Sequence, residues 1–170
     1  YCPEGHYGGR IIIPSFNNNG DINYFIARSY VGHSWRYLNP PAEKDVIFNE
    51  LYVDWDEPIT LVEGVFDAIA AGENAIPVLG STLRDKTKLF QAIALNDTPV
   101  YLAFDQDAEK KTRTIIKNML YYDIELYKID VSGFEDIAEM PRRIFEARKE
   151  MAQAIDHDDY FLMDELRRIM

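Results

Sequence analysis

The sequence predicts an α/β fold: a mostly parallel four-stranded sheet flanked by helices, preceded by a small β-rich part and followed by a helical segment. Two short apolar runs support this, ITLVEG at 59–64 and PVYLAFDQD at 99–107, because a helical pattern follows each of them. Such alternation is typical of parallel βαβ units. We assign residues 1–57 to the β-rich part, 58–140 to the sheet domain and 141–170 to the helical segment.

Composition places the chain among globular proteins outside the membrane. Of its 170 residues, 47% are hydrophobic and 28% are charged, and no apolar run approaches the length of a membrane span. No signal peptide is visible, so no membrane partner is predicted. The lone Cys2 excludes an internal disulfide and favours a reducing compartment such as the cytoplasm. The three histidines and one cysteine do not form a recognisable zinc-binding motif.

Charge is distributed unevenly along the chain. The net charge is -11, but residues 1–44 carry four basic and three acidic side chains, so a net +1 there leaves -12 for the rest. Phosphate groups are contacted mainly by Lys and Arg. Binding of nucleic acid or nucleotide by charge is therefore predicted for the first quarter of the chain.

The β-rich part begins with a predicted hairpin. Apolar strands at 11–16 and 22–27 flank the sequence NNNG at 17–20, whose Asn and Gly residues tolerate positive φ. Its four basic residues, Arg10, Arg28, Arg36 and Lys44, lie beside these strands or beside the aromatic segment WRYLNPP at 35–41. Interleaved Arg and aromatic residues are typical of surfaces that bind phosphates and stack bases, and equally of a β core with surface arginines.

Acidic side chains follow two predicted strands of the sheet domain. Glu63 ends the first strand, Asp67 lies four residues later on the next helix, and Asp105 and Asp107 end the third strand. Carboxyl ends of parallel strands meet at one sheet edge, where clustered carboxylates repel one another unless a cation lies among them. Asp105 and Asp107 point to the same side, roughly 7 Å apart by the strand rise. The pattern predicts a Mg²⁺ or Mn²⁺ site.

The remaining elements of the sheet domain follow in order. A short helix at 65–71 ends at Gly72, a strand follows at 75–80, and Thr82 with Asp85 has the spacing of a capping box that opens the next helix. A helix is predicted at 108–123 and a fourth strand at 124–130. From Pro141 onward we expect two short helices, the second with an apolar side formed by Leu162, Leu166 and Ile169.

The order of these motifs resembles a known family. EGVFDAIAAG, PVLGSTL, VYLAFDQDA and GFEDIAEM together resemble the TOPRIM domain that DnaG-type primases, topoisomerases and some nucleases share. The likeness covers about residues 59–140. Upstream, GGRIIIPSFNNNGDINYFIARSY and RYLNPP are similar to the segment before TOPRIM in the catalytic core of DnaG-type primases, with phage primases the most similar.

The resemblance implies a DNA primase that synthesises short RNA primers on single-stranded DNA from ribonucleoside triphosphates, with Mg²⁺ or Mn²⁺. It implies Glu63, Asp105 and Asp107 as catalytic metal ligands and Asp67 and Asp136 as further acids of the cluster. It also favours nucleotide or DNA binding by the four basic residues, a replicative helicase as partner, and the host cytoplasm as location for a phage-encoded protein.

The sequence departs from the family pattern at two places, and alternatives stay open. Glu109 and Lys110 stand where the family more often has Ala-Gly, and Glu135 stands where it often has Lys before the acid. A TOPRIM nuclease would use the same acids. A non-catalytic fragment that binds DNA or a replication partner is consistent with the missing zinc site. A topoisomerase needs a further large domain, for which this chain is too short.

Overall fold

The structure, a computed structural model, describes residues 1–80, 82–105 and 108–169. Its contacts divide the chain into two compact units, Tyr1–Val53 and Asp54–Met170. Across the described ranges, no helix has both the length and the apolar character needed to cross a bilayer.

The first unit is built on an antiparallel hairpin. Strand β1 (Arg10–Phe16) pairs with β2 (Ile22–Ser29) in a register that places Arg10 opposite Ser29. The connecting turn is closed by Asn17, whose Oδ1 accepts the backbone N–H of Asn19 and of Asp21 at 3.0 and 2.9 Å. The predicted hairpin is confirmed. A short 3₁₀ helix, η1 (Glu50–Tyr52), packs against β1.

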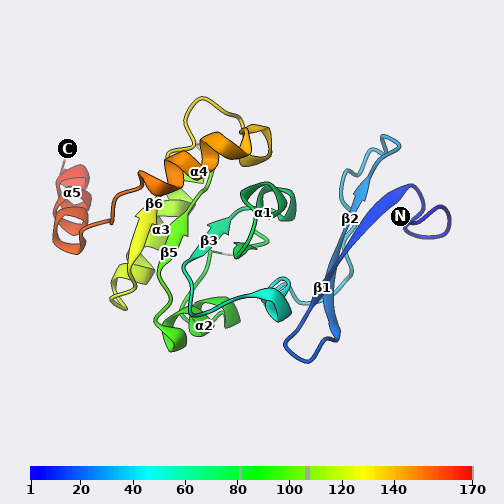
Figure 1. Ribbon diagram of the computed structural model, residues 1–170, viewed down its shortest axis with the longest axis horizontal. Coiled ribbons are helices and arrows are strands. Elements are labelled where there is room, and N and C mark those ends of the chain that lie inside the picture. The colour runs from blue at the N-terminus through cyan, green and yellow to red at the C-terminus, as the bar shows by residue number, and fades with distance from the viewer. Residues whose placement is uncertain (81, 106–107, 170) are drawn as a thin grey trace. The chain divides into compact units, whose positions relative to one another are not determined.

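The second unit contains a four-stranded, fully parallel sheet, which confirms the predicted fold class. Its strands lie in the order β4-β3-β5-β6 (Figure 1). Their bounds are Ile59–Val62 for β3, Ala75–Pro77 for β4, Val100–Leu102 for β5 and Leu126–Lys128 for β6. Strand β3 is central and all four of its residues are buried. The chain leaves β3 for β4 on one side and reaches β5 on the other, so strand order reverses between β3 and β5.

Helices cover both faces of this sheet, with α4 in front and α3 behind in Figure 1. One face packs Val62, Ala103 and Ile129 against Phe145 of α4. On α3, the side chains of Ile115 and Met119 are fully buried. The helices are α1 (Val65–Ala71), α2 (Lys88–Asn96), α3 (Glu109–Leu120), α4 (Arg142–Glu150) and α5 (His157–Ile169), with a 3₁₀ turn, η3 (Ile137–Glu139), after β6.

The segment between β4 and α2 differs from the prediction. We expected a helix from Thr82, but α2 begins at Lys88, and Thr82 instead accepts a hydrogen bond from Nε of Arg84. Leu83 is buried and has a left-handed backbone with φ 46°. That conformation costs a non-glycine residue about 1–2 kcal/mol and is incompatible with a helix start at this point. Burial of the Leu83 side chain offsets this cost.

The tail covers the outer edge of the sheet and then docks on α3. Ile155 donates its backbone N–H to the carbonyl of Leu126 in β6 at 2.7 Å, so the chain after α4 pairs with the edge strand. Helix α5 then reaches α3 through an ion pair between Lys117 and Asp164 at 2.6 Å. On the expected apolar side of α5, Leu162 and Leu166 are exposed, and the side chain of Ile169 lies outside the described part of the chain.

Asn74, just before β4, is joined by hydrogen bonds to the segment that precedes β3. Its Nδ2 donates to the carbonyls of Asp54 and Glu57 at 2.8 and 3.1 Å, and its Oδ1 accepts the N–H of Asp54 at 3.0 Å. Its backbone is left-handed, with φ 55°. We expect Asn74→Ala to lower the free energy of unfolding by about 2–3 kcal/mol, through lost hydrogen bonds and backbone strain.

Urea denaturation followed by circular dichroism measures this change. The control is Asn74→Gly, which adopts positive φ freely and should therefore lose roughly 1 kcal/mol less than Asn74→Ala. Unfolding midpoints for both variants equal to that of the wild type would contradict the assigned role.

Candidate functional site

The candidate site begins where β3 ends. Glu63 follows the last residue of β3, and Gly64 is the N-cap of α1. Asp67, in the first turn of α1, turns back so that its Oδ2 accepts the backbone N–H of Gly64 at 2.9 Å. A Cβ on Gly64 would lie only 3.1 Å from that oxygen. The glycine therefore makes room for the Asp67 carboxylate, and the two acids are held at one strand exit.

A third acid reaches the same place from the loop after β6. Burial raises the pKa of Asp67 above its ordinary value, and the negative charges of Asp136 and Glu63 raise it further, against the lowering effect of the Gly64 hydrogen bond. The charge of Asp136 acts on Asp67 because η3 packs against α1. Asp136 is fixed in place as the N-cap of η3, since its Oδ1 accepts the backbone N–H of Glu139 at 2.9 Å.

Asp105 lies after β5, beyond the buried residues Ala103 and Phe104. Its backbone carbonyl accepts the N–H of Ala108 at 3.1 Å, which turns the chain into α3. Because strand order reverses between β3 and β5, Glu63 and Asp105 both lie at the position where open α/β sheets bind ligands. Asp107, also predicted at this edge, lies outside the described residues.

The two carboxylate oxygens of Glu63 bear most directly on whether this edge could bind a metal. Its Oε1 is buried and has no hydrogen-bond partner among the described residues, while its Oε2 lies 3.8 Å from Nζ of Lys111. A hard cation would bind this buried oxygen, which has no hydrogen-bond partner among the described residues. It would also offset the negative charges around Asp67. The described residues on their own bring together no group of three ligands placed to hold an ion. A Mg²⁺ held by Glu63 would therefore take few protein oxygens and would complete its shell with water and phosphate.

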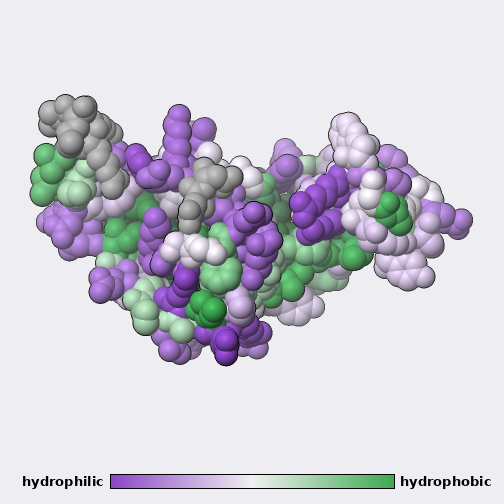
Figure 2. All heavy atoms as spheres, turned by 90° about the horizontal axis from the view of Figure 1, so that it is seen from above, coloured by the Kyte–Doolittle hydropathy of each residue, from purple (hydrophilic) through white to green (hydrophobic). Residues whose placement is uncertain are grey.

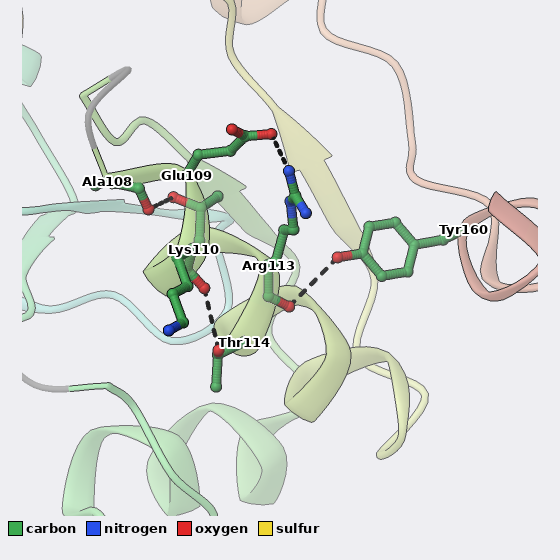
Figure 3. Close-up of polar contacts among 7 residues, drawn as sticks. Ala108, Glu109, Lys110, Arg113, Thr114 and Tyr160 are labelled. Carbon is green, nitrogen blue, oxygen red and sulfur yellow. Dashed lines mark hydrogen bonds and ion pairs between the residues drawn. The ribbon is translucent and has the colours of Figure 1, made fainter. Parts of the chain in front are cut away.

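A cavity of about 510 Å³ adjoins this edge on the side of β6 and was not predicted. Asp105 forms part of its wall, together with Thr112, Arg113, Lys128, Ser132 and Tyr160. Figure 3 shows how Arg113 is held there: its guanidinium pairs with Glu109, and its carbonyl accepts the hydroxyl of Tyr160 at 3.3 Å. The i, i+4 spacing of Glu109 and Arg113 is the sequence signal that could have indicated this pair.

Figure 2 views the molecule from above Figure 1 and so faces the carboxyl ends of the strands. Hydrophilic side chains cover much of the surface in this view, with smaller apolar areas between them.

Arg10 differs from the expectation of a surface residue. It is 4% exposed, and its guanidinium donates to the carbonyls of Trp35 at 2.9 Å and of Arg36 at 3.3 Å. A third, longer contact reaches the carbonyl of Ala27 at 3.5 Å. Arg10 therefore holds the 35–36 segment in place. The alternation of the hairpin does not reveal this, because Arg10 is the first residue of its strand.

The other basic residues of the first unit are less buried. The guanidinium carbons of Arg28 and Arg36 lie 5.8 and 6.0 Å from the ring centroid of Tyr37. Trp35, next to Arg36, is 73% exposed, and Lys44 is also exposed. Cations beside exposed aromatic rings form a surface that can contact phosphates and stack bases.

Comparisons with known proteins agree with this architecture. No family model matches the chain. It is 27% identical over 174 residues to a DNA primase of Thermotoga maritima, which covers 92% of this chain and 30% of that protein. The structure of a DnaG primase catalytic domain bound to single-stranded DNA superimposes with a TM-score of 0.75 at 21% identity, over 96% of this chain and 57% of that one.

A more distant likeness is to the primase domains of bacteriophage T7, solved with the lagging-strand DNA polymerase and an RNA/DNA hybrid. It has a TM-score of 0.53 at 13% identity and covers 82% of this chain and 73% of that one. The chain spans less than a third of the length of the Thermotoga primase described above. The chain is thus related in sequence to a DNA primase and shares the fold of a DnaG primase catalytic domain, including the parallel four-stranded sheet.

Proposed function

We propose that this chain is part of the catalytic core of a DNA primase that joins ribonucleotides into short RNA primers on single-stranded DNA, with Mg²⁺ or Mn²⁺. One observation carries the proposal: Glu63 and Asp67 follow β3 and Asp105 follows β5, the two strands between which strand order reverses. Homology to a DNA primase over 92% of the chain supports it.

The proposed roles of the acids follow from their positions. When bound, a divalent cation supplies charge neutralisation at the triphosphate and alignment for attack by the primer 3′ hydroxyl. Glu63 and Asp105 would hold it, with Asp107 as a further predicted ligand. Asp67 and Asp136 are positioning acids, because one accepts the Gly64 N–H and the other caps η3. Their charge keeps the edge strongly negative and selects cations.

The proposed nucleic-acid contacts lie on the first unit. Arg28, Arg36 and Lys44 would neutralise phosphates of template or nucleotide, and the exposed ring of Trp35 would stack on a base. Binding of single-stranded DNA by a DnaG catalytic domain of the same fold supports this role. Arg10 acts indirectly by holding the carbonyls of Trp35 and Arg36.

The proposal extends to a phage-type enzyme on the strength of the sequence motifs alone. A replicative helicase stays a predicted partner.

Metal binding gives the first test of this proposal. We expect millimolar Mg²⁺ or Mn²⁺ to raise the melting temperature, since a ligand bound only by the folded state stabilises it. Glu63→Gln keeps the size of the side chain and removes its charge, so this variant should lose most of the shift. The measurement is differential scanning fluorimetry with and without metal. The same shift in wild type and Glu63→Gln would place the metal elsewhere.

Asp105→Asn separates catalysis from folding. If Asp105 holds the cation, primer synthesis should fall by orders of magnitude, whereas metal-free stability should hold or rise because repulsion between carboxylates is relieved. Asp97→Asn is the matched control, since Asp97 lies at the end of α2 with a left-handed backbone that Asn adopts equally well.

The assay uses labelled ribonucleotides on single-stranded DNA, with a nuclease assay run beside it. An Asp105→Asn protein that keeps its activity but melts well below the wild type would show that Asp105 is structural. DNA cleavage without primer synthesis would favour the nuclease.

Salt dependence tests the first unit. The double variant Arg28→Ala, Arg36→Ala should bind single-stranded DNA more weakly and flatten the plot of log affinity against log salt by roughly one unit, as expected for one or two lost phosphate contacts. Its control is Lys86→Ala, Arg143→Ala, which removes the same charge from exposed positions of the second unit. Fluorescence anisotropy at several salt concentrations measures the slopes. Equal slopes for both double variants would remove Arg28 and Arg36 from the binding surface.

A further inference from the structure

Lys111, in the first turns of α3, has a position that the site described above does not explain. Its Nζ lies 3.8 Å from Oε2 of Glu63, and the two side chains are only 20% and 29% exposed. A lysine in an amphipathic helix ordinarily lies on the exposed side. The structure instead turns it toward the acid that ends the central strand.

A second contact fixes the direction of this side chain. The Lys111 ammonium lies 5.7 Å from the ring centroid of Phe104, a buried residue next to Asp105. An ammonium near the face of an aromatic ring is attracted by the ring's negative charge density. Lys111 therefore reaches from α3 across the exit of β5 to the exit of β3. Its charge lies at the edge where the acids meet.

The other cations of α3 are used differently. Arg113 pairs with Glu109 within the helix, and Lys117 pairs with Asp164 of α5. Lys110, the immediate neighbour of Lys111, is exposed. Among these cations, Lys111 is the one for which the structure shows an ion pair with a proposed metal ligand. The helix thus presents a cation to an edge that otherwise gathers negative charge.

We propose that Lys111 is the resident counter-ion of the acid edge: its ammonium neutralises Glu63 while no divalent cation is bound, and it gives up this contact when Glu63 becomes a ligand. This inference rests on the proposed metal site. Oε1 of Glu63 is buried and accepts no hydrogen bond from the described residues, so the ammonium meets only one of the two oxygens. The incoming cation and the ammonium compete for the same carboxylate.

Competition of this kind has two effects of opposite sign. Removing the ammonium leaves Glu63 and Asp67 with less positive charge nearby, so the metal-free protein loses stability. The same removal takes away a positive charge that repels a divalent cation, so metal affinity rises. A lysine that only packs against Phe104 would lower stability without raising metal affinity. The two measurements together distinguish a counter-ion from a structural residue.

The experiment compares Lys111→Met with Lys110→Met, which removes the same charge from the adjacent position. Binding of Mn²⁺ is measured by electron paramagnetic resonance of the free ion, and metal-free stability by thermal melting. We expect Lys111→Met to bind Mn²⁺ roughly three- to tenfold more tightly than wild type and to melt at a lower temperature without metal. Lys110→Met should change both quantities less.

Two further comparisons test the counter-ion role of Lys111 separately from the proposed metal site. Lys111→Arg keeps the charge and should stay close to wild type in Mn²⁺ affinity. In the Glu63→Gln background, Lys111→Met should no longer lower the metal-free melting temperature more than Lys110→Met does, because the partner charge is gone.

The outcomes separate the two ideas. Mn²⁺ binding by wild type that Glu63→Gln abolishes, together with equal affinities for Lys111→Met and Lys110→Met, would overturn the counter-ion role and leave the metal site intact. Weaker Mn²⁺ binding by Lys111→Met would also overturn it. Failure of both wild type and Lys111→Met to bind Mn²⁺ would overturn the metal site and the counter-ion role together.

Discussion

The architecture of the second unit depends on the burial of β3 between two parallel neighbours. All four of its residues are buried, and it pairs with β4 on one side and β5 on the other. Since the next strand along the chain after β3 lies on one side of it and β5 on the other, strand order reverses between β3 and β5. Glu63 and Asp105 lie at these carboxyl ends, where open α/β sheets bind ligands.

Placing several carboxylates at this edge costs free energy, and neighbouring hydrogen-bond donors and a cation offset part of that cost. Asp67 takes a backbone N–H from Gly64, and Asp136 takes one from Glu139. Both hydrogen bonds favour the ionised carboxylates, whereas burial and mutual repulsion oppose them at Asp67. Lys111 adds a positive charge beside Glu63. In the proposed metal site, these contacts would hold the carboxylates in position before a cation binds.

Much of this arrangement was predictable from the sequence because it depends on local patterns. Strands β3 and β5 are apolar runs followed by acids, and parallel strands bring those acids to one edge whatever the details of packing. The loop before α2 was mispredicted because the capping spacing of Thr82 is local, whereas the left-handed conformation of Leu83 depends on where its side chain is buried. The sequence also did not predict that the Lys111 side chain points toward Glu63. A small rotation of α3 about its axis decides whether that position faces solvent or Glu63.

Arg10 shows the same limit in the first unit: three carbonyls within reach of one guanidinium come from segments more than fifteen residues away along the chain. Basic residues look alike in a sequence whether they bind phosphate or backbone. The structure separates the two uses, because a buried guanidinium without acceptors would be costly and Arg10 has them.

The two edges of the parallel sheet are protected by different means. On the outer side of β6, Ile155 donates to Leu126, and Ala154 bridges to Tyr127. On the opposite edge, β4 ends in Pro77, whose nitrogen has no hydrogen to offer another strand. A shortened protein ending at Met151 would keep its sheet but expose the polar groups of β6 to neighbouring molecules. Such a truncation should self-associate as its concentration rises, whereas the full chain keeps that edge satisfied within one molecule.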